Sequence, residues 1–297
     1  TAEFTETVTL TVLPSSGLPG VPGAETVTGR IINDESLFST AFDLVFLQDL
    51  SGSFSDDIAT VRGLLPTLLT DINGVQPNTP IAVTSFIDKP IEPFGGSTDY
   101  AYRTDLSATT DAAAIFAAYD GFSADGGEDV PDSQLEALLQ VARRDGELGL
   151  RPTARTVAVL FTDAGYHMAG DGAAAGITTP NNLDAVLDGT PASTGEDYPE
   201  LAGLRDALLA ADVLPVFAVT ASEASTYEGL VNTLALGGGV VELSSDSSNI
   251  VDAISTGLSN LFLLEARLPD GSLATSGLTV DEDGGTASFE VRLSAPP

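Results

Sequence analysis

Apolar and polar positions divide residues 42–263 into two alternating kinds of segment. Continuous apolar runs predict buried strands at residues 44–47, 81–87, 156–161, 213–219 and 240–243. Apolar residues at helical spacing predict helices at 55–69, 108–119, 131–144, 198–211, 221–235 and 248–263. Repeated strand–helix alternation predicts an α/β domain with a doubly wound, mostly parallel sheet and helices on both of its faces.

The two ends of the chain follow a different pattern. Residues 5–12 and 25–32 predict two strands around a Gly/Pro/Ser-rich turn, and residues 264–268, 278–280 and 287–293 predict three more. We therefore divide the chain into β strands at 1–35, an α/β domain at 36–263 and β strands at 264–297. An isolated hairpin is only marginally stable, so each flank needs a partner. Either the flanks form one small β-sandwich with the α/β domain inserted between its strands, which we favour, or each completes a different module of a longer protein.

The net charge of the chain limits the classes of molecule that it could bind. The chain carries 43 acidic and 11 basic residues, a net charge of −32. Nucleic acids and anionic membrane surfaces need basic patches, so both are disfavoured, and the sequence has no apolar run long enough for membrane insertion. Most of the carboxylates are expected to be solvated surface, but the excess also suits divalent cations. The chain has no cysteine, which excludes disulfides and thiolate metal sites.

Oxygen-bearing side chains gather where the predicted strands end. The first strand runs into Asp49, Ser51 and Ser53, and two further strands run into Asp88 and Asp163. A second acidic segment, G-G-E-D-V-P-D, precedes the helix predicted at 131–144. Parallel strands end at one edge of a sheet, where carboxylates repel one another. Hard oxygen ligands suit Mg²⁺, Mn²⁺ and Ca²⁺, so we expect a divalent cation there.

These motifs resemble a known family in their order. D-L-S-G-S-F-S-D-D, S-F-I-D-K-P-I-E-P-F, D-V-P-D, L-F-T-D-A-G-Y-H-M-A-G-D-G-A-A-A-G-I, D-Y-P, F-A-V-T and S-S-D-S-S-N follow one another as in a von Willebrand factor A domain. The similarity is specifically to the I-like domain of integrin β subunits, and it covers nearly all of residues 42–263. The flanking G-R-I-I-N-D-E and V-D-E-D-G-G-T-A-S-F-E-V-R-L-S-A-P-P resemble the end and the start of a Calx-β module.

The resemblance implies three metal sites. The central one, the metal-ion-dependent adhesion site, would hold Mg²⁺ or Mn²⁺ through Asp49, Ser51, Ser53, Asp132 and Asp163. The adjacent one would hold Ca²⁺ through Asp56, Asp57 and the carbonyls of Ser53 and Ser245. The third, with Ca²⁺ as the candidate cation, would use Asp88, Asp129, the carbonyl of Pro131 and the side chain of Asp132.

Three features depart from the family pattern. Asp132 is one methylene shorter than the Glu of the family, and Gly127 stands where the family has an Asn ligand. Because Gly127 has no side chain, the third site loses a ligand and is the least secure of the three. Glu128 or Asp125 could compensate for this loss. The long specificity loop of the family is reduced to residues 94–102 without its disulfide. We therefore expect no integrin α-type subunit as a partner, and a bacterial surface or secreted protein.

His167 is the only histidine and follows Asp163 closely. It could lie near the metal face, but a structural or exposed role is the one we favour. One histidine and no cysteine speak against a nucleophilic triad and against a zinc site, so we expect no enzyme.

The favoured function is a cation-dependent adhesion module, extracellular or on a cell surface, whose central metal binds an acidic side chain of a protein ligand. The resemblance implies that movement of the last helix, 248–263, tunes this metal. The alternative is a calcium-rigidified spacer in a long extracellular repeat protein.

Overall fold

A computed structural model describes residues 6–12, 25–31 and 41–261 of the 297-residue chain. In the N-terminal part, strands β1 (Glu6–Val12) and β2 (Glu25–Ile31) pair antiparallel, with Thr9 opposite Thr28. The strands predicted at 264–297 and the domain boundaries at 35/36 and 263/264 lie outside the described residues. The sandwich hypothesis therefore stays a prediction.

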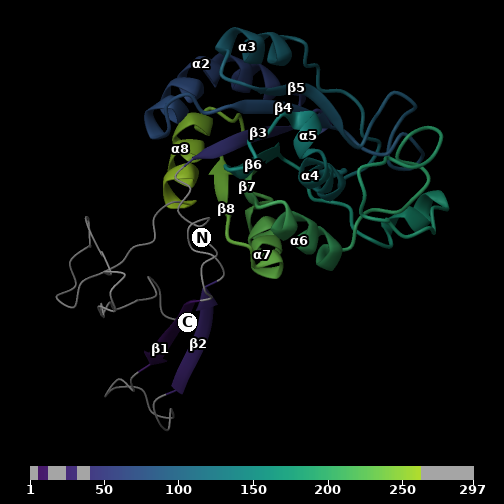
Figure 1. Cartoon of the computed structure of the whole chain (residues 1–297). Helices are drawn as coiled ribbons and strands as arrows, with labels where there is room; N and C mark the ends of the chain where they lie inside the picture. The colour runs from purple at the N-terminus through teal and green to yellow at the C-terminus, as the bar shows by residue number, and fades with distance from the viewer. Residues whose placement is uncertain (1–5, 13–24, 32–40, 262–297) are drawn as a thin grey trace.

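A six-stranded sheet forms the centre of the α/β domain (Figure 1). Its strands in spatial order are β5 (Arg103–Thr109), β4 (Ile81–Phe86), β3 (Phe42–Asp49), β6 (Arg155–Thr162), β7 (Val213–Thr220) and β8 (Gly239–Leu243). All neighbouring pairs are parallel except β4 and β5. The predicted doubly wound, mostly parallel sheet is confirmed.

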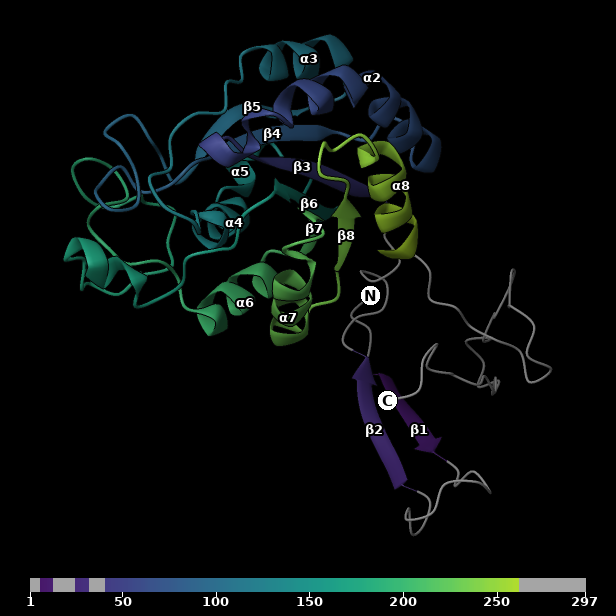
Figure 2. The same cartoon turned by 180° about the vertical axis from the view of Figure 1, so that it is seen from behind.

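Helices cover both faces of this sheet (Figures 1 and 2). One face packs on α2 (Ile58–Val75), α3 (Ala112–Asp120) and α8 (Ile250–Leu261). The other packs on α4 (Gln134–Arg143), α6 (Leu201–Ala210) and α7 (Ala224–Leu234). The short α5 (Asp145–Leu148) and the 3-10 helices η1 (Gly52–Ser55) and η2 (Asp171–Ala175) lie in the connections. No helix in the described part of the chain has the length and apolar character to cross a membrane.

Alternate residues of each central strand enter opposite cores. Phe46 of β3 packs with α2 and α3, whereas its neighbour Leu47 packs with α4, and both side chains are fully buried. Because both faces are covered, consecutive positions such as residues 44–47 are apolar, which explains the continuous runs in the sequence.

The edge strand β5 differs from the prediction, which placed a helix at 108–119. Residues 103–109, R-T-D-L-S-A-T, are strand, and α3 begins only at Ala112, after the side chain of Asp111 caps it by accepting from the Ala113 amide. β5 pairs on one side only and is half-exposed, so it lacks a buried strand's apolar run. Irregular register between β4 and β5 weakens the pattern further.

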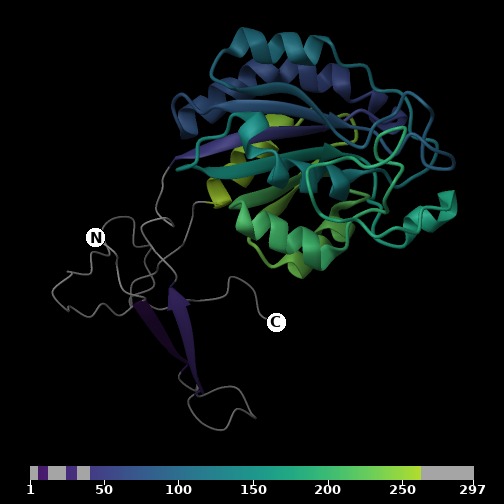
Figure 3. The same cartoon turned by 45° about the vertical axis from the view of Figure 1, so that its right-hand side comes forward.

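The strand order determines where a ligand can bind. From β3 the chain moves to β4 and β5 on one side and then crosses to β6, β7 and β8 on the other. The loops that leave β3 and β6 therefore diverge at the carboxyl edge of the sheet, which is where open α/β sheets bind ligands. Figure 3 shows the sheet between its two helical layers, with the long connections gathered at one end.

We predict that Phe46→Ala destabilises the protein by about 3–5 kcal/mol, since it removes a fully buried ring that packs on Tyr119 and Phe161. Leu209→Ala, at a side chain that is 61% exposed, is the matched control and should change the free energy of unfolding by no more than about 0.5 kcal/mol. Urea unfolding followed by circular dichroism measures both. Equal losses in the two variants would contradict the packing described here.

Candidate metal centre

Asp49 is the last residue of β3 and the base of the predicted central site. Its Oδ1 accepts a 2.7 Å hydrogen bond from the Ser51 amide, and its Oδ2 accepts one of 2.6 Å from the Thr162 hydroxyl at the end of β6. The side chain is fully buried. Burial raises the pKa of Asp49 to about 7, against the opposing effect of these two hydrogen bonds.

Two hydroxyls connect the ends of β3 and β6. The Oγ atoms of Ser51 and Ser53 lie 3.0 Å apart, and Ser53 donates a 2.8 Å hydrogen bond to Oδ1 of Asp163. Burial also raises the pKa of Asp163. The structure therefore brings Asp49, Ser51, Ser53 and Asp163 together in one row, as the sequence predicts.

Asp132 reaches the same place from the loop before α4. Its amide donates to the Gly165 carbonyl at 3.3 Å, and its own carbonyl accepts from the His167 amide at 3.0 Å. The side chain is 1% exposed, and neither carboxylate oxygen makes a well-formed hydrogen bond, although Ser51 lies close enough to affect its pKa. Burial, followed by the nearby charges of Asp49 and Asp88, raises that pKa to about 10. Two unsatisfied buried oxygens beside a row of carboxylates and hydroxyls fit a hard divalent cation.

The absence of a side chain at Gly127 leaves space for the carboxylate of Asp132. Its φ is +68°, and an added Cβ would come within 2.9 Å of Oδ1 of Asp132. Its amide donates to the carboxylate of Asp99 at 3.0 Å, which holds this turn in place. The two suggested replacements for the family's Asn, Asp125 and Glu128, are both exposed. Neither belongs to the close cluster of metal-ligating groups found among the described residues.

The predicted adjacent site surrounds Asp57 at the start of α2. Asp57 is buried, and its Oδ1 has no hydrogen-bond partner. Burial raises its pKa, Ser247 lowers it, and the charges of Asp56, Asp163 and Asp246 raise it further. The loop between β8 and α8 therefore lies beside Asp57.

Two other predicted ligands of this site, Asp56 and Ser245, are exposed. Ser245 lies in the same loop, two residues before Ser247. The ligand role of its carbonyl stays a prediction.

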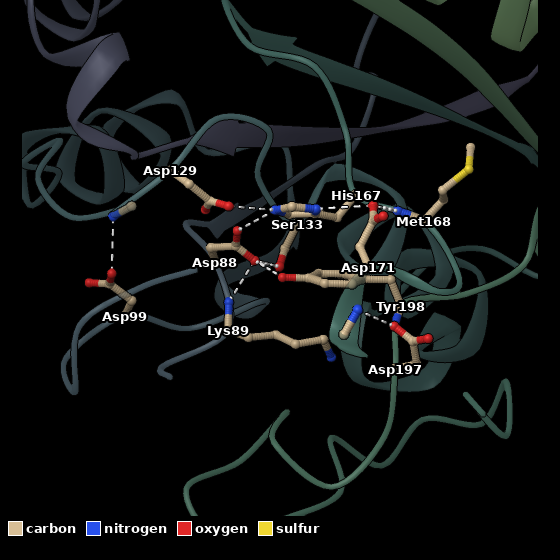
Figure 4. A network of polar contacts seen from close by, with 12 residues as sticks. Asp88, Lys89, Asp99, Asp129, Ser133, His167, Met168, Asp171, Asp197 and Tyr198 are labelled. Carbon is tan, nitrogen blue, oxygen red and sulfur yellow. Dashed lines mark hydrogen bonds and ion pairs between the residues drawn. The ribbon is translucent and has the colours of Figure 1, made fainter. Parts of the chain in front are cut away.

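Asp88 anchors the predicted third site just beyond β4. Its Oδ1 accepts three hydrogen bonds, from the Lys89 amide (2.7 Å), the Ser133 hydroxyl (2.5 Å) and the Tyr198 hydroxyl (2.6 Å). Its Oδ2 has no hydrogen-bond partner. Burial raises the pKa of Asp88 to about 6 and also raises that of Asp129. Figure 4 shows both carboxylates on the same side of the His167 ring.

His167 is the residue of this site for which the sequence favoured another place. Its side chain is buried, and Nε2 lies 3.5 Å from Oδ2 of Asp88 and 3.4 Å from Oδ2 of Asp129. The expected exposure is wrong, because the ring is buried, whereas the possibility of a place near the metal face fits its position within the cluster. The structural role stays a prediction. The short parallel bridge between Asp132 and Tyr166 brings the histidine there. Pro131 directly precedes Asp132, and the ligand role of its carbonyl stays a prediction.

Comparison with known proteins agrees with the fold. The family model described as the integrin beta chain VWA domain matches residues 39–262. Integrin beta-2 of Bos taurus is 34% identical over 251 residues, which cover 77% of this chain and 32% of the relative. Integrin beta-7 of Homo sapiens is 33% identical, with coverage of 77% and 32%. Integrin beta pat-3 of Caenorhabditis elegans is also 33% identical, with coverage of 71% and 28%. The chain thus spans about a third of the length of these relatives.

We predict that the metal-stripped protein loses stability as the pH rises from about 4 to about 7. Asp49 and Asp88 have folded-state pKa values of about 7 and about 6, raised from 3.8, so the folded state binds protons more tightly than the unfolded state. Their contribution to stability is complete below the unfolded pKa and is lost as the pH rises through the folded values. Urea unfolding in EDTA across this range measures the slope, and saturating Mg²⁺ with Ca²⁺ should flatten it.

Asp132→Asn should reduce the slope of the unfolding free energy against pH by up to about 1.4 kcal/mol per pH unit. The substitution removes one group whose proton affinity differs between the folded and unfolded states. Glu228→Gln, at an exposed carboxylate on α7, is the matched control and should leave the slope unchanged. A pH-independent stability in EDTA would contradict the electrostatic description of the site.

Proposed function

The chain belongs to the integrin beta chain VWA domain family, and from this premise we propose that it is a divalent-cation-dependent adhesion module. In this proposal, a metal held by Asp49, Ser51, Ser53, Asp132 and Asp163 binds an acidic side chain of a protein ligand. The observation that carries it is the pair of unsatisfied, buried oxygens of Asp132 beside that row of hard ligands.

The exposure of the five residues supports an open coordination position. Asp49, Ser51 and Asp132 are buried, whereas Ser53 is exposed and Asp163 is partly exposed. A metal at this place would be held from beneath by buried oxygens and would face solvent on the side of Ser53. A carboxylate from another protein could complete its coordination from that side, and Mg²⁺ or Mn²⁺ suits such a set of ligands.

The adjacent site gives this module a means of regulation. We assign Ca²⁺ to Asp56 and Asp57, with the carbonyls of Ser53 and Ser245. This ion would connect the start of α2 with the loop that precedes α8. The two helices also contact each other, with Ser255 of α8 lying 3.4 Å from a carboxylate oxygen of Asp71. A shift of α8 would therefore alter the position of Asp57 and, through Ser53, the central metal.

The same proposal covers partner and location. Within the reduced loop, residues 94–102, the Asp99 amide donates to the Gly96 carbonyl and the Gly96 amide to the Asp99 carboxylate, and the Phe94 ring is buried. A compact loop supports a module that works without an integrin α-type subunit. The net charge of −32 supports a protein partner rather than nucleic acid. We place the module outside the cell or on its surface, in a bacterial surface or secreted protein, and assign it no catalytic step.

We predict at least two cation sites by calorimetry on the metal-stripped chain, titrated separately with Mg²⁺ and Ca²⁺. Asp49→Ala should remove the Mg²⁺ site and Asp57→Ala the tightest Ca²⁺ site, since each variant removes a buried ligand. Glu228→Gln should bind both ions as the parent does, and circular dichroism should show all variants folded. A single Ca²⁺ site indifferent to Asp49→Ala would replace the adhesion proposal with the calcium-rigidified spacer.

A second prediction concerns the ligand. Panning a displayed random-peptide library on the chain in Mg²⁺ and eluting with EDTA should enrich peptides that contain Asp or Glu. Synthetic copies of these peptides should lose at least about tenfold in affinity for Asp49→Ala, and also when their acidic residue becomes Asn or Gln. Enrichment without acidic residues, or binding that persists in EDTA, would contradict capture through the central metal.

A further inference from the structure

We propose that Asp88, Asp129 and His167 form a site for a first-row transition metal of the Zn²⁺ class, with the histidine Nε2 as a ligand. The three ligand atoms lie within 4.8 Å of one another. The site stands where the family resemblance implies an all-oxygen calcium site. It does not depend on whether the central metal binds a ligand.

The distances suit a single ion shared by three donors. Nε2 of His167 is 3.5 Å from Oδ2 of Asp88 and 3.4 Å from Oδ2 of Asp129, too long for well-formed hydrogen bonds. Two donors each about 2.1 Å from a tetrahedral ion lie about 3.4 Å apart. A fourth position would be open to solvent near Asp129, whose side chain is 31% exposed.

Two of the three donor atoms lack a hydrogen bond. Nε2 of His167 and Oδ2 of Asp88 are buried without a hydrogen-bond partner, and on Asp129 the second carboxylate oxygen, Oδ1, is also buried and unpartnered. Asp88 and His167 are themselves 0% and 5% exposed. Buried polar atoms in native proteins are nearly always satisfied, so two unsatisfied atoms that face each other, beside a carboxylate with an unsatisfied oxygen, indicate a missing partner. Two carboxylates facing an imidazole nitrogen favour a cation as that partner.

The opposite side of the histidine ring is arranged as in metal-binding histidines. Nδ1 of His167 lies 3.1 Å from Oδ2 of Asp171, which also accepts from the Met168 amide at 2.9 Å (Figure 4). A carboxylate on Nδ1 holds the proton there and leaves the lone pair on Nε2 for a metal. The ring stacks on Tyr198 at 4.6 Å between centroids and meets the edge or face of Phe94 at 4.8 Å, which fixes its orientation.

Asp88 is held just as firmly. Its Oδ1 receives three hydrogen bonds, from Lys89, Ser133 and Tyr198, so its Oδ2 is fixed toward Nε2 of the histidine. The Lys89 ammonium does not take the place of a metal. It donates to the Ser193 carbonyl at 2.9 Å and lies 4.6 Å from the centre of the Tyr198 ring.

The nitrogen donor determines the class of metal. Ca²⁺ and Mg²⁺ take oxygen ligands, whereas imidazole suits zinc and its transition-metal neighbours. Gly127 removes the amide oxygen that the family resemblance would supply, and neither Asp125 nor Glu128 replaces it. The close cluster of donors at this point is two carboxylates and one imidazole, which resembles a zinc site more than a calcium site.

The single histidine makes the test direct. We expect Zn²⁺, added to the metal-stripped ¹⁵N-labelled chain, to shift the ¹⁵Nε2 resonance and leave Nδ1 protonated, with saturation at one equivalent for this site. Ca²⁺ and Mg²⁺ should leave both ring nitrogens unchanged. A ¹⁵Nε2 resonance that does not respond to Zn²⁺ overturns the proposal, whatever happens at the central site.

Two variants separate a ligand from a structural residue. His167→Gln replaces the nitrogen with an amide oxygen, so zinc affinity measured by competition with a chelator should fall while calcium affinity does not. Asp171→Asn should weaken zinc by about 10- to 100-fold, as expected for the partner of a metal-bound histidine.

Asp129→Asn, at the most exposed of the three ligands, covers the case in which His167→Gln fails to fold, and it should also lower zinc affinity. Glu228→Gln is the control and should bind zinc as the parent does. Zinc affinity unchanged in folded His167→Gln and Asp129→Asn would overturn the assignment. Equal losses of calcium and zinc affinity in His167→Gln would overturn the assignment as well, since that result indicates a structural role for the histidine.

Discussion

The burial of like charges at one edge of the sheet is the constraint on which this structure depends. Asp49, Asp88 and Asp132 are almost completely buried, and burial is the largest cause of the raised pKa of each. Hydrogen bonds from Ser51, Thr162, Ser133 and Tyr198 offset part of the free-energy cost of burying these charges, but their donors carry no positive charge. Bound protons or metal ions must offset the rest of that cost, so protons and metal ions compete for the same oxygens.

The backbone explains why the fold keeps these carboxylates together. The Ser133 amide donates to the Ile87 carbonyl, the Asp132 amide to Gly165, and the His167 amide back to Asp132. The loop before α4 is therefore attached to the exits of both β4 and β6, on either side of β3. Asp129 and Asp132 occupy fixed positions between the central and third clusters. One loop therefore supplies side chains to both clusters.

The parts of this site that the sequence predicts are those set by strand order. Asp49 and Asp163 follow apolar runs that had to be central parallel strands, so their meeting follows from the topology alone. Asp132 was placed by family resemblance, because no local pattern shows that a loop residue returns to this edge. β5 was missed because a half-exposed edge strand lacks an apolar run. The burial of His167 was not predicted because its position depends on pairing between Asp132 and Tyr166, which are 34 residues apart in the sequence.

Gly127 and His167 together give the edge two different chemistries. On the side of Asp49, the available donors are carboxylates and hydroxyls, which suit hard cations. On the side of Asp88, the glycine supplies no oxygen and the histidine supplies a nitrogen held by Asp171. Because the charges of Asp49 and Asp88 both oppose ionisation of Asp132, an ion bound on either side would reduce the repulsion that an ionised Asp132 must overcome. Occupation of the Asp88 side would therefore favour Asp132 as a charged ligand of the central metal, which couples the two sites through one carboxylate.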